Sequence, residues 1–125
     1  MKKAITSPNA PAPIGPYSHA MLANGFLFVS GQVGKKAVTG ELVLGDIKSE
    51  TKQVMENIGA ILKEVEMDYS NIVKTTIFLK DMNDFAAVNE VYGSYFSGNY
   101  PARETVQVSK LPLNVNVEIS VIAVK

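Results

Sequence analysis

The segment that ends the chain before Lys125 constrains the fold more than any other. Every second residue in it is apolar, which is typical of a β-strand with one face in a protein core. These apolar residues are Val115, Val117, Ile119, Val121 and Ala123. The opposite face begins polar, carries Glu118 as its one acid, and becomes apolar at Ile122 and Val124. A sheet that contains the strand Val115–Val124 therefore needs cover on both of its faces.

One long amphipathic helix is predicted to supply part of that cover. Apolar residues recur at helical spacing from Ile47 to Val65, so that one stripe faces the core. Asp46 stands where an N-cap is expected, and Glu50 lies in the first turn, where the helix dipole favours an acid. The pattern predicts that this helix ends near Met67.

A second, shorter helix is predicted after a cap at Asp81 or Asn83. Its apolar face runs from Phe85 to Phe96 and includes Asn89. By its position alone, Asn89 is better explained as an amide whose hydrogen bonds are satisfied at a helix interface than as a ligand contact. Two helices are able to cover only one face of a sheet of this size.

The remaining strands are predicted from alternation and from turn residues. Residues 1–16 contain four prolines and little periodicity, and we expect them to form an extended arm. Asn24-Gly25 between two apolar runs is a strong hairpin signal, because both residues tolerate a positive φ. The run Phe26–Val29 is apolar throughout, so burial on both sides is expected. The predicted strands before the last one are Tyr17–Ala23, Phe26–Ser30, Ile72–Lys80 and Glu104–Ser109.

This order, ββ–α–β–α–ββ, predicts an α+β sandwich in a single domain spanning residues 1–125. Both helices are expected on one face of a mixed sheet. The uncovered face then needs a partner, and a second copy of the chain is the most economical one. Self-association is therefore predicted from the pattern alone.

The composition excludes several kinds of site. Twelve acidic residues balance twelve basic ones and no basic stripe is present, which disfavours binding to nucleic-acid phosphates. The chain has no cysteine and one histidine, so metal sites and catalytic triads have few possible ligands or bases. No apolar run approaches signal-peptide length or the ~20 residues of a membrane span. We expect a soluble, cytoplasmic protein, with His19 as an exposed or hydrogen-bonded strand residue rather than a catalytic one.

Arg103 is the one arginine among the twelve basic residues, and it follows Tyr100-Pro101-Ala102. Its planar fork of donors is suited to a carboxylate, and Pro101 stiffens the approach to it; a surface arginine placed by chance is the alternative. Glu118 lies on the face assigned to a partner and has two explanations. One is an ion pair with a lysine, which the pattern alone slightly favours. The other is a carboxyl group beside Arg103 that holds a water or moves a proton.

Six segments of the chain follow one another with the residues and near-constant spacing of a known family: Gly15-Pro16-Tyr17-Ser18, Val29-Ser30-Gly31-Gln32, Ile72–Thr76, Asp84-Phe85 with Asn89 and Tyr92, Tyr100-Pro101-Ala102-Arg103, and Val117-Glu118-Ile119 with Ile122–Val124. In these segments the chain resembles the RidA (YjgF) family of enamine/imine deaminases, essentially from end to end. The resemblance implies a chorismate-mutase-like α+β fold and a homotrimer with clefts between the subunits.

The resemblance also implies a reaction. It is the hydrolysis of enamine and imine intermediates, such as 2-aminoacrylate and 2-iminobutanoate, to 2-keto acids and ammonia, with no cofactor and no metal. Arg103 would bind the substrate carboxylate, Glu118 would orient or activate the attacking water, and Tyr17 would close the pocket. The other residues that the resemblance assigns to the substrate are Ser30, Gly31, Asn89 and the backbone of Thr105, which would contact the imine nitrogen.

Departures from the family pattern bear on this interpretation. Thr105 stands where many active members have cysteine, Glu104 adds a charge beside Arg103, and Ser120 replaces a common second glutamate. The main alternative is a non-catalytic trimeric binder of small 2-keto acids or similar carboxylates, in which Arg103 keeps its role and Glu118 is structural. A role directed at RNA is a third hypothesis, which the neutral net charge opposes.

Overall fold

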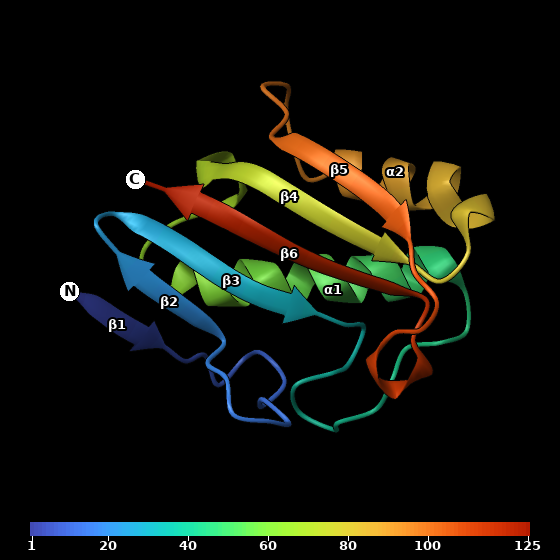
Figure 1. Cartoon of the computed structure of the whole chain (residues 1–125), viewed down its shortest axis with the longest axis horizontal. Helices are drawn as coiled ribbons and strands as arrows, with labels where there is room; N and C mark the ends of the chain where they lie inside the picture. The colour runs from blue at the N-terminus through green and yellow to red at the C-terminus, as the bar shows by residue number, and fades with distance from the viewer.

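A mixed β-sheet forms the centre of the molecule, and the computed structural model describes all of residues 1–125. Its strands are β1 (Lys2–Ile5), β2 (Ala20–Ala23), β3 (Phe26–Gln32), β4 (Ile72–Leu79), β5 (Ala102–Gln107) and β6 (Val117–Val124). They lie in the order β1-β2-β3-β6-β4-β5 (Figure 1). Neighbouring strands run antiparallel except β4 and β5, which are parallel. The last strand of the chain is therefore a central one, as its two-sided pattern requires.

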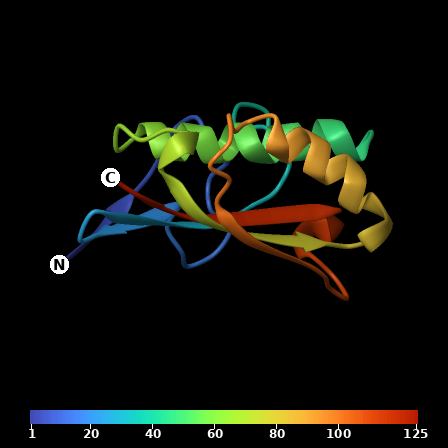
Figure 2. The ribbon, with the colours of Figure 1, turned by 90° about the horizontal axis from the view of Figure 1, so that it is seen from above.

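Both helices, α1 (Ile47–Lys63) and α2 (Phe85–Gly93), lie on the same face of the sheet (Figure 2). Asp46 caps α1 as predicted, because its side chain accepts a hydrogen bond from the backbone N–H of Ser49 at 2.9 Å. The core between the helices and the sheet includes these fully buried residues: Val54, Ile58, Leu62, Val117, Ile119 and Ala123. The predicted α+β architecture is confirmed. No helix combines the length and the apolar character needed to cross a membrane.

The prediction for the N-terminal arm is wrong in part. Lys2–Ile5, which precedes the first proline, forms β1 and pairs antiparallel with Ala20–Ala23. The strand predicted from Tyr17 starts only at Ala20. Residues 6–19 leave the sheet as a loop, because their prolines cannot donate to a strand ladder and because His19 is buried beneath the loop.

Helix α1 ends at Lys63 and not near Met67. Glu66 adopts a positive φ of 58°, so the chain reverses direction there. The backbone N–H of Met67 then donates to the carbonyl of Leu62 at 3.0 Å and satisfies one of the last carbonyls of the helix. Apolar residues continue at helical spacing past the end of the helix because Val65 and Met67 still pack on the core. The spacing alone therefore did not reveal the turn.

The other boundaries differ from prediction by a few residues. Strand β4 ends one residue before the predicted Lys80. Strand β5 is Ala102–Gln107 and not Glu104–Ser109, since its parallel pairing with β4 begins at Ala102. Strand β6 starts at Val117, because a 3-10 turn at Pro112–Asn114, with Leu113 and Asn114 in the left-handed region, precedes it.

The sheet face away from the helices is open in one chain and partly apolar. Phe26 and Phe28 are 41% and 45% exposed, and Phe28 stands beside Ile122 in the ladder. The expectation that Phe26–Val29 is buried on both sides is therefore wrong for a single chain: Leu27 and Val29 face the helices and are buried, but the two phenylalanines are not. Self-association through this face stays a prediction.

Candidate active site in two halves

Arg103 lies on β5 and points toward α2. It stands beside Thr75 in the parallel ladder, and Thr75 is fully buried on the helix side of the sheet. The guanidinium Nη1 donates to Oδ1 of Asn89 at 2.7 Å. The guanidinium carbon lies 5.6 Å from the ring centroid of Phe85 and 5.2 Å from that of Tyr92, within cation–π range of both. The side chain is thus oriented before any ligand binds.

We call the hollow next to this guanidinium the Arg103 half-site. It is lined by Asn89, Tyr92, Gly93, Tyr100, Pro101 and Arg103. Burial raises the pKa of Tyr92, and the hydrogen bond with Thr75 and the Arg103 charge oppose that rise only in part. The phenol therefore keeps its proton at neutral pH and donates to Oγ1 of Thr75 at 2.9 Å. That buried bond fixes the ring on which Arg103 rests.

Asn89 makes its hydrogen bond to a strand and not across a helix interface. Its amide oxygen is satisfied, as predicted from position, but the donor is Arg103 of β5. This contact orients the guanidinium. A direct contact between Asn89 and a substrate stays a prediction.

Thr105 lies two residues beyond Arg103 on the same face of β5. Its hydroxyl oxygen is buried and has no hydrogen-bond partner within the chain. Because β5 is an edge strand, one side of its backbone has no strand partner within the chain. The predicted contact of the Thr105 backbone with the imine nitrogen is not tested by this geometry.

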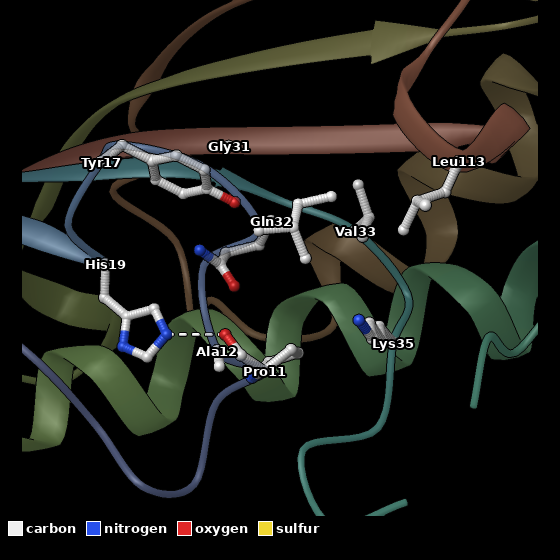
Figure 3. Close-up of a pocket in the computed structure, with 10 residues that line it drawn as sticks. Pro11, Ala12, Tyr17, His19, Gly31, Gln32, Val33, Lys35 and Leu113 are labelled. Atoms are coloured by element: carbon white, nitrogen blue, oxygen red, sulfur yellow. Dashed lines mark hydrogen bonds between the residues drawn. The ribbon is translucent and has the colours of Figure 1, made fainter. Parts of the chain in front are cut away.

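A second hollow, of about 480 Å³, lies on the other face of the sheet and is lined by Ile14, Tyr17, Ser30, Gly31, Val33, Pro112, Leu113 and Glu118; we call it the Glu118 half-site. Tyr17, Ser30, Gly31 and Glu118, four of the residues predicted from the sequence, thus lie together. Figure 3 shows the adjoining cavity, which shares Tyr17, Gly31 and Leu113 with this hollow.

A β-bulge shapes the floor of the Glu118 half-site. The pairing of β3 with β6 shifts between Val29 opposite Val121 and Gln32 opposite Ile119, so that Ser30 and Gly31 together oppose one residue of β6. A β-carbon at Gly31 would lie 2.6 Å from Oε2 of Glu118. Only glycine leaves room there for the carboxyl group in its present position.

Glu118 is half-buried and makes no ion pair. The ion pairs of the chain join Lys48 to Glu90 and Lys74 to Glu104, so the predicted lysine partner for Glu118 is not found within the chain. Burial raises the pKa of the Glu118 carboxyl above its usual value. The charge of Glu104 is directed to Lys74, at 3.1 Å, and does not compete for Arg103.

Ser30 and His19 hold the segment that carries Tyr17. The hydroxyl of Ser30 donates to the carbonyl of Ser18 at 2.7 Å, and the Ser30 backbone N–H donates to the carbonyl of His19 at 3.0 Å. His19 is 2% exposed, and both of its ring nitrogens are hydrogen-bonded. The expectation of a hydrogen-bonded residue is confirmed, but His19 lies just before β2 and not in a strand as predicted. Tyr17 itself is 48% exposed over the hollow.

Sequence reasoning missed several residues of the two halves. Phe85 and Tyr92 were assigned to the apolar face of a helix, and only the cation–π geometry reveals their contact with Arg103. Ile14 and Leu113 line the Glu118 half-site from loops that have no periodic pattern. The four prolines of residues 1–16 predicted only an extended arm.

The two half-sites lie on opposite faces of the same sheet. Glu118 stands beside Phe78 in the ladder, whereas Arg103 stands beside Thr75, and residues an odd number apart on β4 point to opposite faces. One chain therefore does not bring Arg103 and Glu118 together, and the clefts between subunits that the resemblance implies stay a prediction. No group of three or more carboxylate or histidine side chains is arranged to hold a metal ion.

These features define an α+β protein with a six-stranded sheet, one face covered by helices and one half-site on each face. The sequence matches the family described as Endoribonuclease L-PSP over residues 7–125. The chain belongs to this family, which is the YjgF/RidA family, and the RidA-type fold predicted from the sequence is confirmed.

Curated relatives span nearly the whole chain. A RutC family protein of Pyrococcus horikoshii is 53% identical over 125 residues, which is 100% of this chain and 99% of the relative. The 2-iminobutanoate/2-iminopropanoate deaminase of Homo sapiens is 43% identical and covers 100% of this chain and 91% of the human protein.

Solved structures agree with the fold. A Thermotoga maritima protein superposes with a TM-score of 0.97 at 46% identity, over 100% of this chain and 98% of that chain. E. coli TdcF with bound serine has a TM-score of 0.94 at 38% identity, over 98% of each chain. The YjgF gene product of E. coli has a TM-score of 0.94 at 40% identity, again over 98% of each chain.

Proposed function

We propose that this protein is a hydrolase that deaminates reactive enamine and imine intermediates of the 2-aminoacrylate and 2-iminobutanoate type to 2-keto acids and ammonia. The observation that carries the proposal is the guanidinium of Arg103, held by Asn89 and two aromatic rings. A guanidinium has five N–H donors, and Asn89 engages one of them, so a fork remains for a substrate carboxylate. The deaminase activity named for the human relative supports the same chemistry.

The proposed active site is composite. One copy of the chain supplies Arg103, and a neighbouring copy supplies Glu118 and Tyr17 above the Ser30-Gly31 bulge. The location of the two half-sites on opposite faces of the sheet supports this arrangement, because a second copy is needed to bring them together. The exposed apolar patch around Phe28 supports a contact between copies on the Glu118 side. In the homotrimer that the family resemblance implies, three such clefts form.

The reaction needs positioning and proton transfer more than strong activation. Arg103 binds the carboxylate in two-point fashion and thereby fixes the adjacent C=N carbon. A water held by Glu118 adds its oxygen to that carbon of the protonated imine while one of its protons passes to the Glu118 carboxylate. The electron pair of the C=N double bond moves to the nitrogen, which becomes a neutral amine. Glu118 returns that proton to the amine, which leaves as ammonia while the new hydroxyl group gives its proton to the Glu118 carboxylate and the carbonyl of the 2-keto acid forms. An enamine substrate is first protonated on carbon, which gives the protonated imine.

The environment of Glu118 suits this exchange of protons. Burial raises the pKa of the carboxyl group and no cation pairs with it, so it holds and releases a proton more readily near neutral pH than an exposed glutamate does. Tyr17 covers the hollow and would reduce the access of bulk water.

Binding without catalysis is the second candidate function. E. coli TdcF binds serine, which carries a carboxylate, so an arginine of this kind also suits a protein that only senses small carboxylates. Cleavage of RNA is a third candidate function, because the family is described as Endoribonuclease L-PSP. The balance of twelve acidic and twelve basic residues opposes it.

The test is to generate 2-iminobutanoate or 2-aminoacrylate in place with an amino-acid oxidase or dehydratase and to follow its loss. Wild type is expected to accelerate the loss, and Arg103→Ala to lower the rate about ten- to hundredfold, as for a lost charge-assisted contact. Arg103→Lys, which keeps the charge but not the planar fork, is expected to fall between the two.

The matched control is Lys63→Ala, which removes one positive charge from the exposed end of α1, outside both half-sites. Mass measurement in solution accompanies each variant. A folded oligomer that never exceeds the spontaneous rate would favour the binding protein, and titration of that oligomer with 2-oxobutanoate would follow. Cleavage of RNA that weakens steeply with added salt would favour the third possibility.

A further inference from the structure

The single histidine of the chain sits beneath the loop that carries Tyr17. His19 is 2% exposed, and its ring contacts two backbone groups of that loop. The backbone N–H of Ser7 donates to Nδ1 at 3.0 Å, and Nε2 lies 2.6 Å from the carbonyl oxygen of Pro11. Figure 3 shows the ring directed at Pro11, with Tyr17 farther along the same loop.

These two contacts fix the protonation state of the ring. Ser7 N–H is a donor, so Nδ1 has to present its lone pair, and the ring proton lies on Nε2. Nε2–H then donates to Pro11. The imidazole is therefore neutral, with each nitrogen in one defined role.

The ring makes the hydrogen bonds that join the middle of the loop to the rest of the molecule, where Ala10 also packs against the core. The other hydrogen bonds of residues 7–17 are local, such as Asn9 N–H to the Ser7 hydroxyl and Tyr17 N–H to the Gly15 carbonyl. Only at Ser18, after Tyr17, does Ser30 attach the chain to β3. Ile14 and Tyr17, which line the Glu118 half-site, thus lie between the two attachment points.

We propose that neutral His19 is the positioning residue for Tyr17, and that protonation of His19 releases the loop and opens the Glu118 half-site. A proton on Nδ1 removes the acceptor of Ser7 N–H and leaves two donors facing each other. The role in catalysis rests on the function proposed above; the release of the loop does not.

The surroundings offer little compensation for a charged ring. The other titratable groups that line its cavity are Tyr17 and Lys35, and no carboxylate lines it. Strand β3 contributes no titratable residue. On α1 the one buried charged group is Glu50, whose carboxylate accepts hydrogen bonds from Asn116 instead. A charged imidazolium at this place has no partner to replace the one that it loses.

Hydrogen exchange tests the proposal without any assay of catalysis. Exchange of residues 6–18, corrected for the intrinsic rate, is compared between about pH 8 and about pH 5, the range in which histidine takes up its proton. Wild type is expected to lose about tenfold in protection of this loop, while residues 94–101 beside Arg103 do not change. The ¹⁵N signals of the one histidine report its protonation in the same samples.

Two variants complete the test. His19→Gln supplies an amide oxygen for Ser7 and an N–H for Pro11 but does not titrate, so its loop is expected to stay protected at low pH. His19→Ala removes both contacts and is expected to expose the loop at every pH. In the deaminase assay, the acid loss of kcat/KM should be smaller in His19→Gln than in wild type, because only the part due to Glu118 remains.

The outcomes are distinguishable. Loop protection that does not change while the ¹⁵N signals report protonation overturns the proposal, even if the protein is an active deaminase. A ring that the ¹⁵N signals show to be neutral down to about pH 5 overturns it as well, because protonation then releases no loop in the range in which histidine ordinarily titrates. The proposal is also overturned if His19→Gln and wild type lose loop protection to the same extent at low pH. Loss of protection in wild type but not in His19→Gln supports the positioning role, even if no deaminase activity is found. Should His19→Ala not fold, the comparison of wild type with His19→Gln still decides.

Discussion

The two half-sites are built on different principles. Arg103 is held by side chains, since the amide of Asn89 and the rings of Phe85 and Tyr92 all come from one helix. Glu118 is held by the backbone: a β-bulge at β3 and the missing side chain of Gly31 make the space that its carboxyl group fills. The first half should fail when a side chain is removed, and the second when one is added.

The difference also fits the proposed roles. A carboxylate-binding guanidinium has to keep a fixed orientation, which stacked rings and a hydrogen bond provide. An acid–base group has to hold a shifted pKa, which partial burial without a cation provides. The two halves are complementary in chemistry but lie on opposite faces of the sheet, so their cooperation is the point to test first.

The largest effect is expected from mixing two inactive variants. Arg103→Ala and Glu118→Gln each remove one half, and each alone should be nearly inactive. When the two chains are unfolded together, refolded and allowed to co-assemble, about a quarter of the clefts should combine an intact Arg103 with an intact Glu118. Recovery of deaminase activity toward that fraction is the expected result.

In the control mixture both chains lack Arg103, so no cleft can be complete. Mixing Arg103→Ala with the double variant Arg103→Ala/Glu118→Gln should restore nothing. If native mass spectrometry finds mixed oligomers and the first mixture still stays inactive, the two half-sites do not belong to one cleft.

Gly31→Ala should lower activity by about a hundredfold with little loss of stability. The new β-carbon would lie 2.6 Å from Oε2 of Glu118, so the carboxyl group has to turn away. The clash is with the end of a flexible side chain, and Gly31 does not have a positive φ, so the backbone tolerates alanine. Gly45→Ala, where a β-carbon meets nothing within 4 Å, is the matched control. A fully active Gly31→Ala would show that the position of Glu118 does not matter.

Asn89→Ala should raise KM several-fold and Asn89→Asp about tenfold or more, with smaller changes in kcat. The alanine variant loses the 2.7 Å bond that orients Arg103. The aspartate variant instead brings a carboxylate that pairs with the guanidinium and competes with the substrate. Asn24→Asp makes the same chemical change at the exposed hairpin turn and should have no such effect. Equal KM values for Asn89→Ala and wild type would indicate that the two rings suffice.

The sequence predicted the elements of both halves better than it predicted their relation. The alternation of β6 and the helical spacing of α1 follow directly from burial, which is periodic, so both elements were found. The separation of Arg103 from Glu118 depends on which face each strand presents in the ladder. Reading that face from sequence requires the pairing of β4 with both β5 and β6, which local patterns do not encode.

The contacts that position the candidate residues were also beyond local patterns. Asn89 and Arg103 are joined by a hydrogen bond across fourteen positions of the sequence. The role of His19 depends on Ser7 and Pro11, in a loop whose prolines suggested only an extended arm. Gly31 was found by resemblance, and its physical reason, contact with Glu118, appears only when β3 and β6 are paired.

The smallest expected effect concerns stability, and it tests the second half alone. Burial raises the folded-state pKa of Glu118 above the usual carboxyl value of 4.5. Between those two values the folded protein keeps a proton that the unfolded chain has lost, so the free energy of unfolding falls as pH rises through this window. Glu118→Gln has no charge to bury. It should therefore be more stable than wild type above the window, by a modest amount because the group is partly solvated, and equal to it at lower pH.

Urea unfolding of wild type and Glu118→Gln at a series of pH values from about 4 to about 8 measures this difference. If the difference in free energy of unfolding between the variant and wild type grows with rising pH, the pKa shift belongs to Glu118. The chain then gives up stability to keep a carboxyl group beside Gly31. Glu64→Gln, at the exposed end of α1, is the matched control and should show no such opening. If Glu118→Gln were instead less stable at neutral pH, the carboxylate would have to be paired in the assembled protein. Arg103 of a neighbouring copy would then be the first partner to examine, because a cation across the cleft is what the composite site supplies.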